Sequence, residues 1–161
     1  MEFAPITAYR LRRVAESILG MAEKLFDVHL GIRALDWRVL VKLAHTPGSI
    51  STDIGRDMLM TPVQTGRSLS KLRDLDLVIA MPAPDDGRAT RYTLTRSGHD
   101  TFEAGLKIVF EVQAYALRDL NAVEQVALES LLGRLVASSN YGPEDIERLS
   151  AALFDGRHKH A

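Results

Sequence analysis

The chain has 161 residues, of which 46% are apolar and 25% are charged, as in an ordinary globular domain. It contains no cysteine, which excludes disulfides, thiolate metal sites and thiol-based redox sensing and fits a reducing cytoplasm. No apolar run reaches the roughly 18 residues of a membrane-spanning helix, and the N-terminus does not resemble a secretory signal, so we expect a cytoplasmic protein without a membrane partner.

Charge is distributed unevenly along the chain, although the net charge is only −1. Residues 33–96 carry ten basic and seven acidic side chains, for +3, whereas residues 97–161 carry six and ten, for −4. This asymmetry indicates a nucleic-acid face in the middle segment. Solvated surface charge explains an excess of this size about as well.

Three helices are predicted before residue 61. Helical spacing of apolar residues predicts the first over residues 6–30, capped by Thr7 and ended by Gly31. The second is predicted over residues 36–45, with Asp36 as its N-cap. After a turn at residues 46–49, Ser51 caps a short third helix. Its inward side chains are expected to be Ile54, Met58 and Leu59.

A fourth helix is predicted over residues 61–75, because Thr61 is a good N-cap and Pro62 suits the first helical position. Its expected apolar stripe consists of Val63, Leu69, Leu72 and Leu75, bordered by Thr65 and Ser68. Its expected outward side chains are Gln64, Arg67, Lys71 and Arg73. Gly66 costs about 1 kcal/mol of helix stability relative to alanine, which close approach to DNA or to a neighbouring helix would explain.

A β-hairpin follows this helix directly. Two β-prone runs, residues 77–81 and 91–95, flank the turn Asp85-Asp86-Gly87-Arg88, in which Gly87 accepts a positive φ. Arg88 lies at the predicted tip. A helix followed at once by a hairpin with a basic tip is typical of a winged helix, in which the helix fits the major groove and the arginine fits the minor groove of DNA.

The C-terminal third is predicted to be helical. A fifth helix is expected over residues 96–119, a sixth after the N-cap Asn121, and a short last helix from Pro143 to about Phe154, with residues 157–161 frayed. The first, fifth and sixth helices carry broad apolar faces. The simplest partner that would bury these apolar faces is a second copy of the chain related by two-fold symmetry. Packing of the faces within one chain is an alternative.

These elements predict a mainly α fold with a small β-hairpin, a winged helix-turn-helix flanked by N- and C-terminal dimerisation helices. Gln64 is expected to read adenine and Arg67 guanine, and Arg91 is expected to reach phosphates beside the minor-groove Arg88. Asp86 is expected to support the wing by bonding loop amides or the Arg88 guanidinium. The predicted DNA-binding side chains are Thr61, Gln64, Thr65, Arg67, Ser68, Lys71, Arg88 and Arg91.

Several motifs resemble the MarR family of winged-helix transcriptional regulators. Residues 37–40, Trp-Arg-Val-Leu, resemble the family's second helix, and residues 51–72 resemble its helix-turn-helix. Leu77-Val78, then Asp86-x-Arg88 and residues 94–98, Leu-Thr-x-x-Gly, resemble its strand, wing and next helix. In element order the resemblance covers roughly residues 10–137.

This resemblance implies a homodimeric regulator, often a repressor, bound to a pseudo-palindromic operator in double-stranded DNA. It implies dimerisation helices over 1–31 and 99–156 and a DNA-binding lobe over 36–98, together one domain over 1–161. It also implies release by a small aromatic or phenolic ligand, whose contacts the sequence does not identify. Two positions depart from the family pattern, because Leu59 and Asp76 stand where glycines are usual. Asp tolerates left-handed backbone better than most residues.

Other chemistry is weakly indicated. No metal site, cofactor or catalytic motif is predicted, so we do not expect an enzyme. Trp37 could stack on a ligand, but core packing is favoured for a lone Trp beside Leu40 and Val41. The alternative function is a winged-helix protein-interaction module that has lost DNA binding. The net charge of −1 supports this alternative.

Overall fold

The computed structural model of the protein describes residues 7–82 and 89–154, without the side chains of 152–154. The predictions for Asp85, Asp86, Gly87, Arg88 and the tail 157–161 therefore lie outside the described residues. The chain divides into two units, Met1–Ala116 and Leu117–Ala161.

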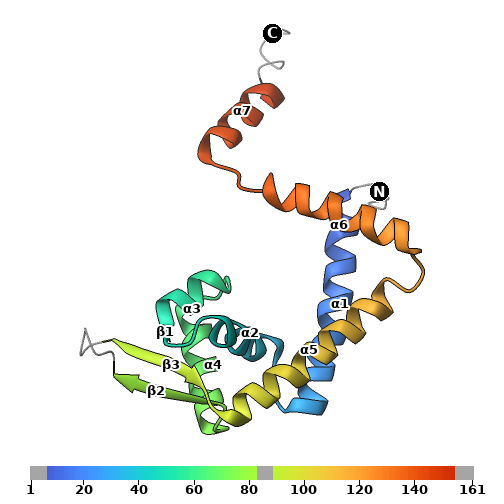
Figure 1. Ribbon diagram of the computed structural model, residues 1–161. Coiled ribbons are helices and arrows are strands. Elements are labelled where there is room, and N and C mark those ends of the chain that lie inside the picture. The colour runs from blue at the N-terminus through green and yellow to red at the C-terminus, as the bar shows by residue number, and fades with distance from the viewer. Residues whose placement is uncertain (1–6, 83–88, 155–161) are drawn as a thin grey trace. The chain divides into compact units, whose positions relative to one another are not determined.

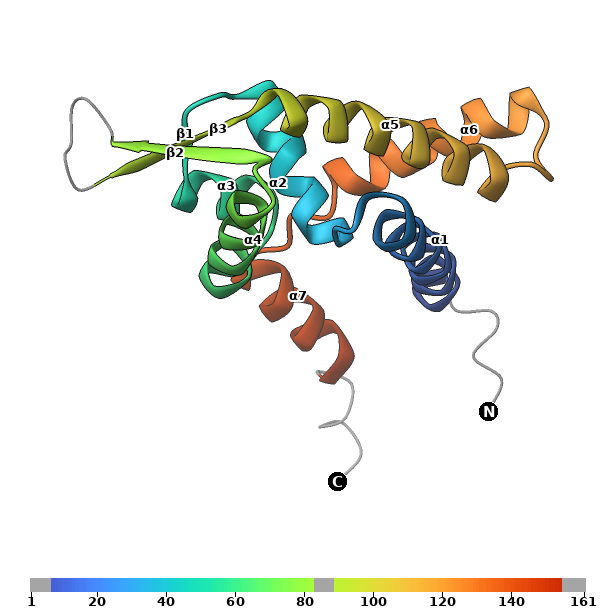
Figure 2. The same ribbon diagram turned by 90° about the horizontal axis from the view of Figure 1, so that it is seen from below.

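The first unit contains five helices and three strands among its described residues (Figure 1). In chain order they are α1 (Thr7–Leu30), α2 (Ala34–His45), β1 (Ser49–Ile50), α3 (Ser51–Asp57), α4 (Pro62–Asp74), β2 (Val78–Pro82), β3 (Thr90–Leu94) and α5 (Arg96–Ala116). Figure 2 shows α2, α3 and α4 gathered beside the strands, while α5 leaves β3 and packs against α1. The predicted fold class, mainly α with a winged helix-turn-helix, is confirmed.

The sheet has three antiparallel strands in the order β1-β3-β2, one more than the predicted hairpin. Ser49 pairs with Tyr92 in β3, and Gly48, at a φ of +79°, donates its N–H to the Tyr92 carbonyl at 2.8 Å. A two-residue strand carries no readable alternation, which is why the sequence indicated only a turn there.

The core of the first unit lies between α2, α4, the sheet and the start of α5. Its buried apolar residues are Ile32, Val39, Leu40, Leu43, Ile54, Met60, Leu69, Leu72, Leu77, Val78, Leu94 and Phe102. Trp37 stacks between Phe26 of α1 and Phe102 of α5, with ring centroids 5.2 and 6.3 Å away. A Cβ at Gly105 would overlap the Trp37 ring, so this glycine lets α5 approach α2. Trp37 is partly buried and packs against the core, as the sequence favoured.

Three local expectations about the helices were wrong. α2 begins at Ala34, with Arg33 as N-cap, so Asp36 is the third helical residue. Leu59 is 85% exposed with a φ of +53°, because the turn before α4 requires left-handed backbone and turns this side chain to solvent. α3 begins at Ser51 with Ile50 as N-cap, so Ser51 is its first helical residue and not its cap. Asp76, by contrast, adopts the left-handed conformation that was expected of an aspartate, at a φ of +54°.

The inward stripe of α4 also differs from the prediction. Val63 and Leu75 are exposed, whereas Thr65 and Ser68 are buried with Leu69 and Leu72. The spacing 65, 68, 69, 72 is helical, but two of its members are hydroxyl residues. Hydropathy therefore placed Leu69 and Leu72 correctly and Val63 and Leu75 wrongly.

The second unit contains α6 (Ala122–Ala137) and α7 (Pro143–Phe154). As predicted, Asn121 caps α6, accepting from the N–H groups of Val123 and Glu124 at 2.9 and 3.0 Å. No residue of α6 is buried. Across both units, none of the described helices combines the length and apolar character needed to cross a membrane.

Candidate nucleic-acid interface

The first turn of α4 is fixed by a reciprocal capping box. The Thr61 hydroxyl accepts from the Gln64 N–H at 3.2 Å, and the Gln64 side-chain oxygen accepts from the Thr61 N–H at 2.9 Å. Pro62 occupies the first helical position, where its missing N–H costs nothing. The start predicted for this helix is confirmed, and its N-terminal side chains are held in a defined place.

The exposed side chains of α4 include most of the predicted DNA contacts. Thr61, Gln64 and Arg67 are exposed, and Lys71 is partly covered. The Gln64 oxygen, however, is engaged in the capping box. A bidentate contact with adenine needs that oxygen as well as the amide nitrogen, so reading adenine in this way would require the cap to open.

Thr65 and Ser68 do not belong to this exposed face, contrary to the predicted DNA contacts. Thr65 is 1% exposed, and its hydroxyl donates to the Thr61 carbonyl at 3.1 Å. A Cβ at Gly55 would lie 3.0 Å from the Thr65 hydroxyl oxygen, so α3 and α4 pack closely here. Ser68 is fully buried and bonded to α2. Their role is to join α4 to its neighbours.

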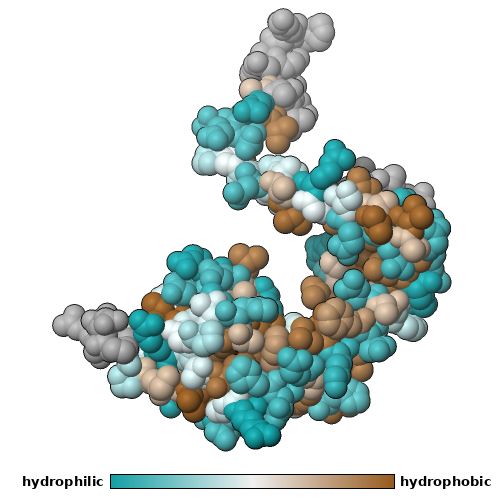
Figure 3. Space-filling model, in the orientation of Figure 1, coloured by the Kyte–Doolittle hydropathy of each residue, from teal (hydrophilic) through white to brown (hydrophobic). Residues whose placement is uncertain are grey.

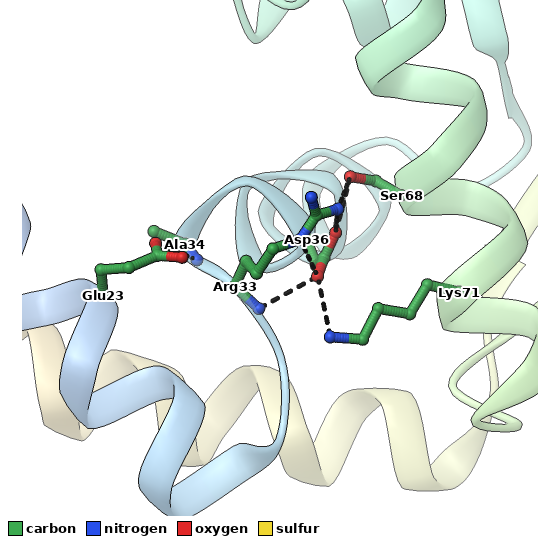
Figure 4. A network of polar contacts seen from close by, with 6 residues as sticks. All are labelled: Glu23, Arg33, Ala34, Asp36, Ser68 and Lys71. Atoms are coloured by element: carbon green, nitrogen blue, oxygen red, sulfur yellow. Dashed lines mark hydrogen bonds and ion pairs between the residues drawn. The ribbon is translucent and has the colours of Figure 1, made fainter.

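A buried carboxylate links α2 to α4 (Figure 4). Asp36 is 0% exposed and accepts from Arg33 through its N–H at 3.0 Å and its guanidinium at 2.7 and 3.1 Å. It also accepts from the Ser68 hydroxyl at 2.6 Å, and the Lys71 ammonium lies 3.4 Å away. The sequence did not reveal this network, because Asp36 and Ser68 are 32 residues apart.

Burial by itself raises the pKa of Asp36, because it disfavours the charged form. Hydrogen bonds from Arg33 and Ser68 act in the opposite direction and outweigh it, so the pKa of Asp36 is below its ordinary value. No buried side-chain nitrogen or oxygen among the described residues lacks a partner. The network is therefore ionised and satisfied.

The same network continues into α1. Glu23 of α1 accepts from the Ala34 N–H, the first amide of α2, at 2.8 Å (Figure 4). α1 and α4 are thus both bonded to the first turn of α2, where an N-terminal amide favours a carboxylate partner.

The predicted wing is described only at its base. Arg91 lies on the central strand β3, opposite Met81 of β2, and its side chain is exposed. It passes beside Gly48, where a Cβ would lie 3.8 Å from a guanidinium nitrogen. Arg88 and Asp86 lie outside the described residues, so their roles stay predictions.

A shallow hollow of about 360 Å³ lies between α3, α4 and β3. It is lined by Arg56 and Arg73, with Gly66 and Leu69 between them and Tyr92 from the sheet. Within residues 7–82 and 89–151, no group of three or more histidine or carboxylate side chains is placed to hold a metal ion. The hollow offers hydrogen bonds, positive charge and apolar surface.

No family model matches the sequence, and no curated protein sequence matches it either. Solved structures do match. A probable transcriptional regulator from Pseudomonas aeruginosa is 27% identical, with a TM-score of 0.72 over 83% of this chain and 99% of that one. The MarR family protein Rv2887 of Mycobacterium tuberculosis, solved in complex with DNA, is 25% identical, with a TM-score of 0.69 over 80% and 96%.

Rv2887 has also been solved in complex with salicylic acid. Apo MarR from E. coli is 20% identical, with a TM-score of 0.73 over 80% of this chain and 95% of that one, a likeness that concerns the fold alone. Together these structures confirm the predicted resemblance to that family.

Proposed function

We propose that this chain, which has the fold of the MarR-family transcriptional regulators, is a homodimeric repressor that binds a pseudo-palindromic operator in double-stranded DNA. The observation that carries the proposal is the start of α4, where a capping box holds Thr61, Gln64 and Arg67 at the surface of a winged helix. It is supported by Rv2887, a protein of this fold that was solved with DNA.

In this proposal α4 enters the major groove, whose width admits an α-helix. Arg67 is exposed and matches the two acceptors of guanine. The positive end of the α4 helix dipole favours a phosphate, as helix N-termini do. Arg88, held by Asp86, enters the minor groove, and Arg91 contacts the flanking phosphates.

The pairing of two copies would cover apolar side chains that the described units leave exposed. On α1 these are Leu11, Val14, Leu19 and Val28, and on α6 they include Val123, Val126 and Val136. Figure 3 shows hydrophobic surface over α5 and, in the second unit, over α6. Helices within 1–31 and 99–156 then join the copies, and the 36–98 lobes contact two half-sites one turn of DNA apart.

A small aromatic or phenolic ligand would release the operator by favouring a spacing of the two α4 helices that no longer fits the DNA. Rv2887, solved with salicylic acid, supports this class of effector. The residues that would bind such a ligand are not assigned.

Selection of bound fragments from a genomic DNA pool tests the proposed function, because it reports binding and half-site spacing together. We expect fragments with two-fold related half-sites, bound with an affinity that falls steeply as salt rises, since phosphate contacts release counterions. Absent or salt-insensitive binding would support the competing protein-interaction module, with which the net charge of −1 is compatible.

Replacing Arg67 with alanine should weaken operator binding by about 1–3 kcal/mol and relax sequence preference at one position. The fold should persist, because the side chain is exposed. Fluorescence anisotropy with operator and single-base variants measures the effect. Arg67→Lys serves as the control, because it keeps the charge but not the paired donors of the guanidinium. An equal loss on every DNA sequence would instead assign Arg67 to phosphates.

Replacing Gly66 with alanine should stabilise the fold by up to about 1 kcal/mol but weaken DNA binding. A Cβ there meets nothing within 4 Å, so the described chain does not require a glycine at this position. Close approach to DNA is the remaining reason for it. Urea unfolding and DNA titration of the same variant measure both effects, and unchanged affinity would contradict the close approach.

A further inference from the structure

We propose that Lys71 serves DNA binding as a positioning residue held by Asp36 of α2, rather than as a contact to a DNA phosphate. This inference rests on the proposed function and refines it, because Lys71 was one of the predicted DNA contacts. It follows from the network at the α2–α4 junction (Figure 4).

The buried carboxylate of Asp36 needs positive charge beside it. Asp36 is fully buried, and an ionised carboxylate removed from water is stable only when cations and hydrogen bonds compensate it. Arg33 supplies one cation, yet 43% of its side chain is exposed to solvent. Lys71, with its ammonium 3.4 Å from the second carboxylate oxygen, supplies the other and is the only cation on α4 paired with Asp36 among the described residues.

Geometry provides a second argument. Ser68 and Lys71 are three residues apart on α4, so they are neighbours on one side of the helix. Both contact Asp36, one through a hydroxyl at 2.6 Å and the other through an ammonium. Two adjacent contacts to one buried group resist rotation of α4 about its axis, and that rotation determines where Arg67 points.

The Lys71 ammonium can pair with Asp36 or with a DNA phosphate, but not with both at once. Lys71 is 36% exposed, so its head group lies at the edge of the network rather than extended into solvent. Moving it to a phosphate would exchange a fixed partner in a poorly solvated site for one that salt screens. It would also leave Asp36 with Arg33 as its only cation. The network therefore holds Lys71 away from the DNA backbone.

Salt dependence distinguishes a positioning lysine from a phosphate contact. Each phosphate neutralised by a lysine contributes about −0.9 to the slope of log Kobs against log[salt]. We would measure this slope by fluorescence anisotropy for the full chain with its selected operator and with random duplex. For Lys71→Met we expect an unchanged slope, unchanged affinity for random DNA and about tenfold weaker operator binding, the usual size of one lost charged contact.

Further variants at the same junction complete the test. Asp36→Asn should release Lys71, so that the slope steepens by up to about 0.9, and adding Lys71→Met should reverse this change. Lys71→Arg keeps the positive charge and should retain most of the operator affinity. If Asp36→Asn does not fold, Ser68→Ala tests the same junction and should lower operator affinity at an unchanged slope.

Two outcomes for Lys71→Met would overturn the inference. A slope reduced by about 0.9 would make Lys71 a phosphate contact, and unchanged operator affinity would show that it positions nothing. DNA binding by the wild-type chain tests the proposed function separately. If the wild type does not bind DNA, the proposed function and the inference about Lys71 both fail. If it binds DNA but Lys71→Met gives either outcome above, only the inference about Lys71 fails.

Discussion

Replacing Gly98 with alanine is expected to destabilise the first unit by about 3 kcal/mol, the upper end of the usual cost of overpacking. A Cβ on Gly98 would overlap the Leu77 carbonyl oxygen, and it would lie 3.0 Å from the carbonyl carbon and 3.3 Å from the Leu94 Cβ. That carbonyl cannot move aside cheaply, because it accepts from the Thr95 N–H at 3.1 Å. The Leu77 N–H is itself bonded to the Leu72 carbonyl at 2.9 Å.

Urea unfolding followed by circular dichroism measures this effect. Gly20→Ala is the matched control, because Gly20 is also helical and a Cβ there meets nothing within 4 Å. It should be neutral or stabilising by up to about 1 kcal/mol. If Gly98→Ala unfolded within about 0.5 kcal/mol of wild type, the close approach of α5 to the Leu77 carbonyl would not be as described.

Local chemistry made the starts of α4 and α6 and the left-handed backbone at Asp76 predictable from the sequence, whereas the N-caps predicted for α2 and α3 were wrong. Thr61 with Pro62 and Asn121 mark helix starts through bonds to amides two or three residues away, so a short window contains the whole signal. Asp76 was similarly interpreted from its own backbone preference. Leu59 was not, because its apolar side chain suggested burial while the turn required a positive φ.

What the sequence did not reveal depends on contacts between distant segments. β1 exists because residues 49 and 50 meet β3, more than 40 positions later. Ser68 is buried because Asp36 accepts its hydroxyl, and without that partner a serine is expected at the surface. Gln64 was predicted as a base reader from its side-chain chemistry, yet the same oxygen also completes a capping box. Hence the element order and the exposure of Gln64 and Arg67 were predictable, but the burial of Thr65 and Ser68 was not.

Replacing Asp36 with alanine is expected to cost about 3–5 kcal/mol, the usual loss when one partner of a buried charged network is removed. The change would leave the buried Ser68 hydroxyl without its acceptor and the Arg33 N–H without its cap. Asp36→Asn keeps the shape and one acceptor, so it should cost less. Urea unfolding of the two variants measures the difference. Equal losses would mean that the ionised carboxylate accounts for the whole effect, because only the Asn variant keeps the shape and one acceptor.

The pH dependence of stability gives the same network a second test. Because the pKa of Asp36 is lowered in the folded chain, the unfolded chain binds more protons near pH 4, and stability rises with pH there. The stabilisation is fully present above the unfolded pKa of about 3.9 and is lost as pH falls through the lower folded pKa. Asp36→Asn should therefore reduce the slope of the unfolding free energy against pH in the acid range below about pH 4. Asp57 should still contribute a smaller slope of unfolding free energy against pH, because Lys42 and, to a lesser extent, Arg56 lower its pKa. The contribution is small because solvent screens the ion pair of Asp57 with Lys42. A slope in this acid range that Asp36→Asn leaves unchanged would mean that Asp36 does not hold α4 as an ionised group.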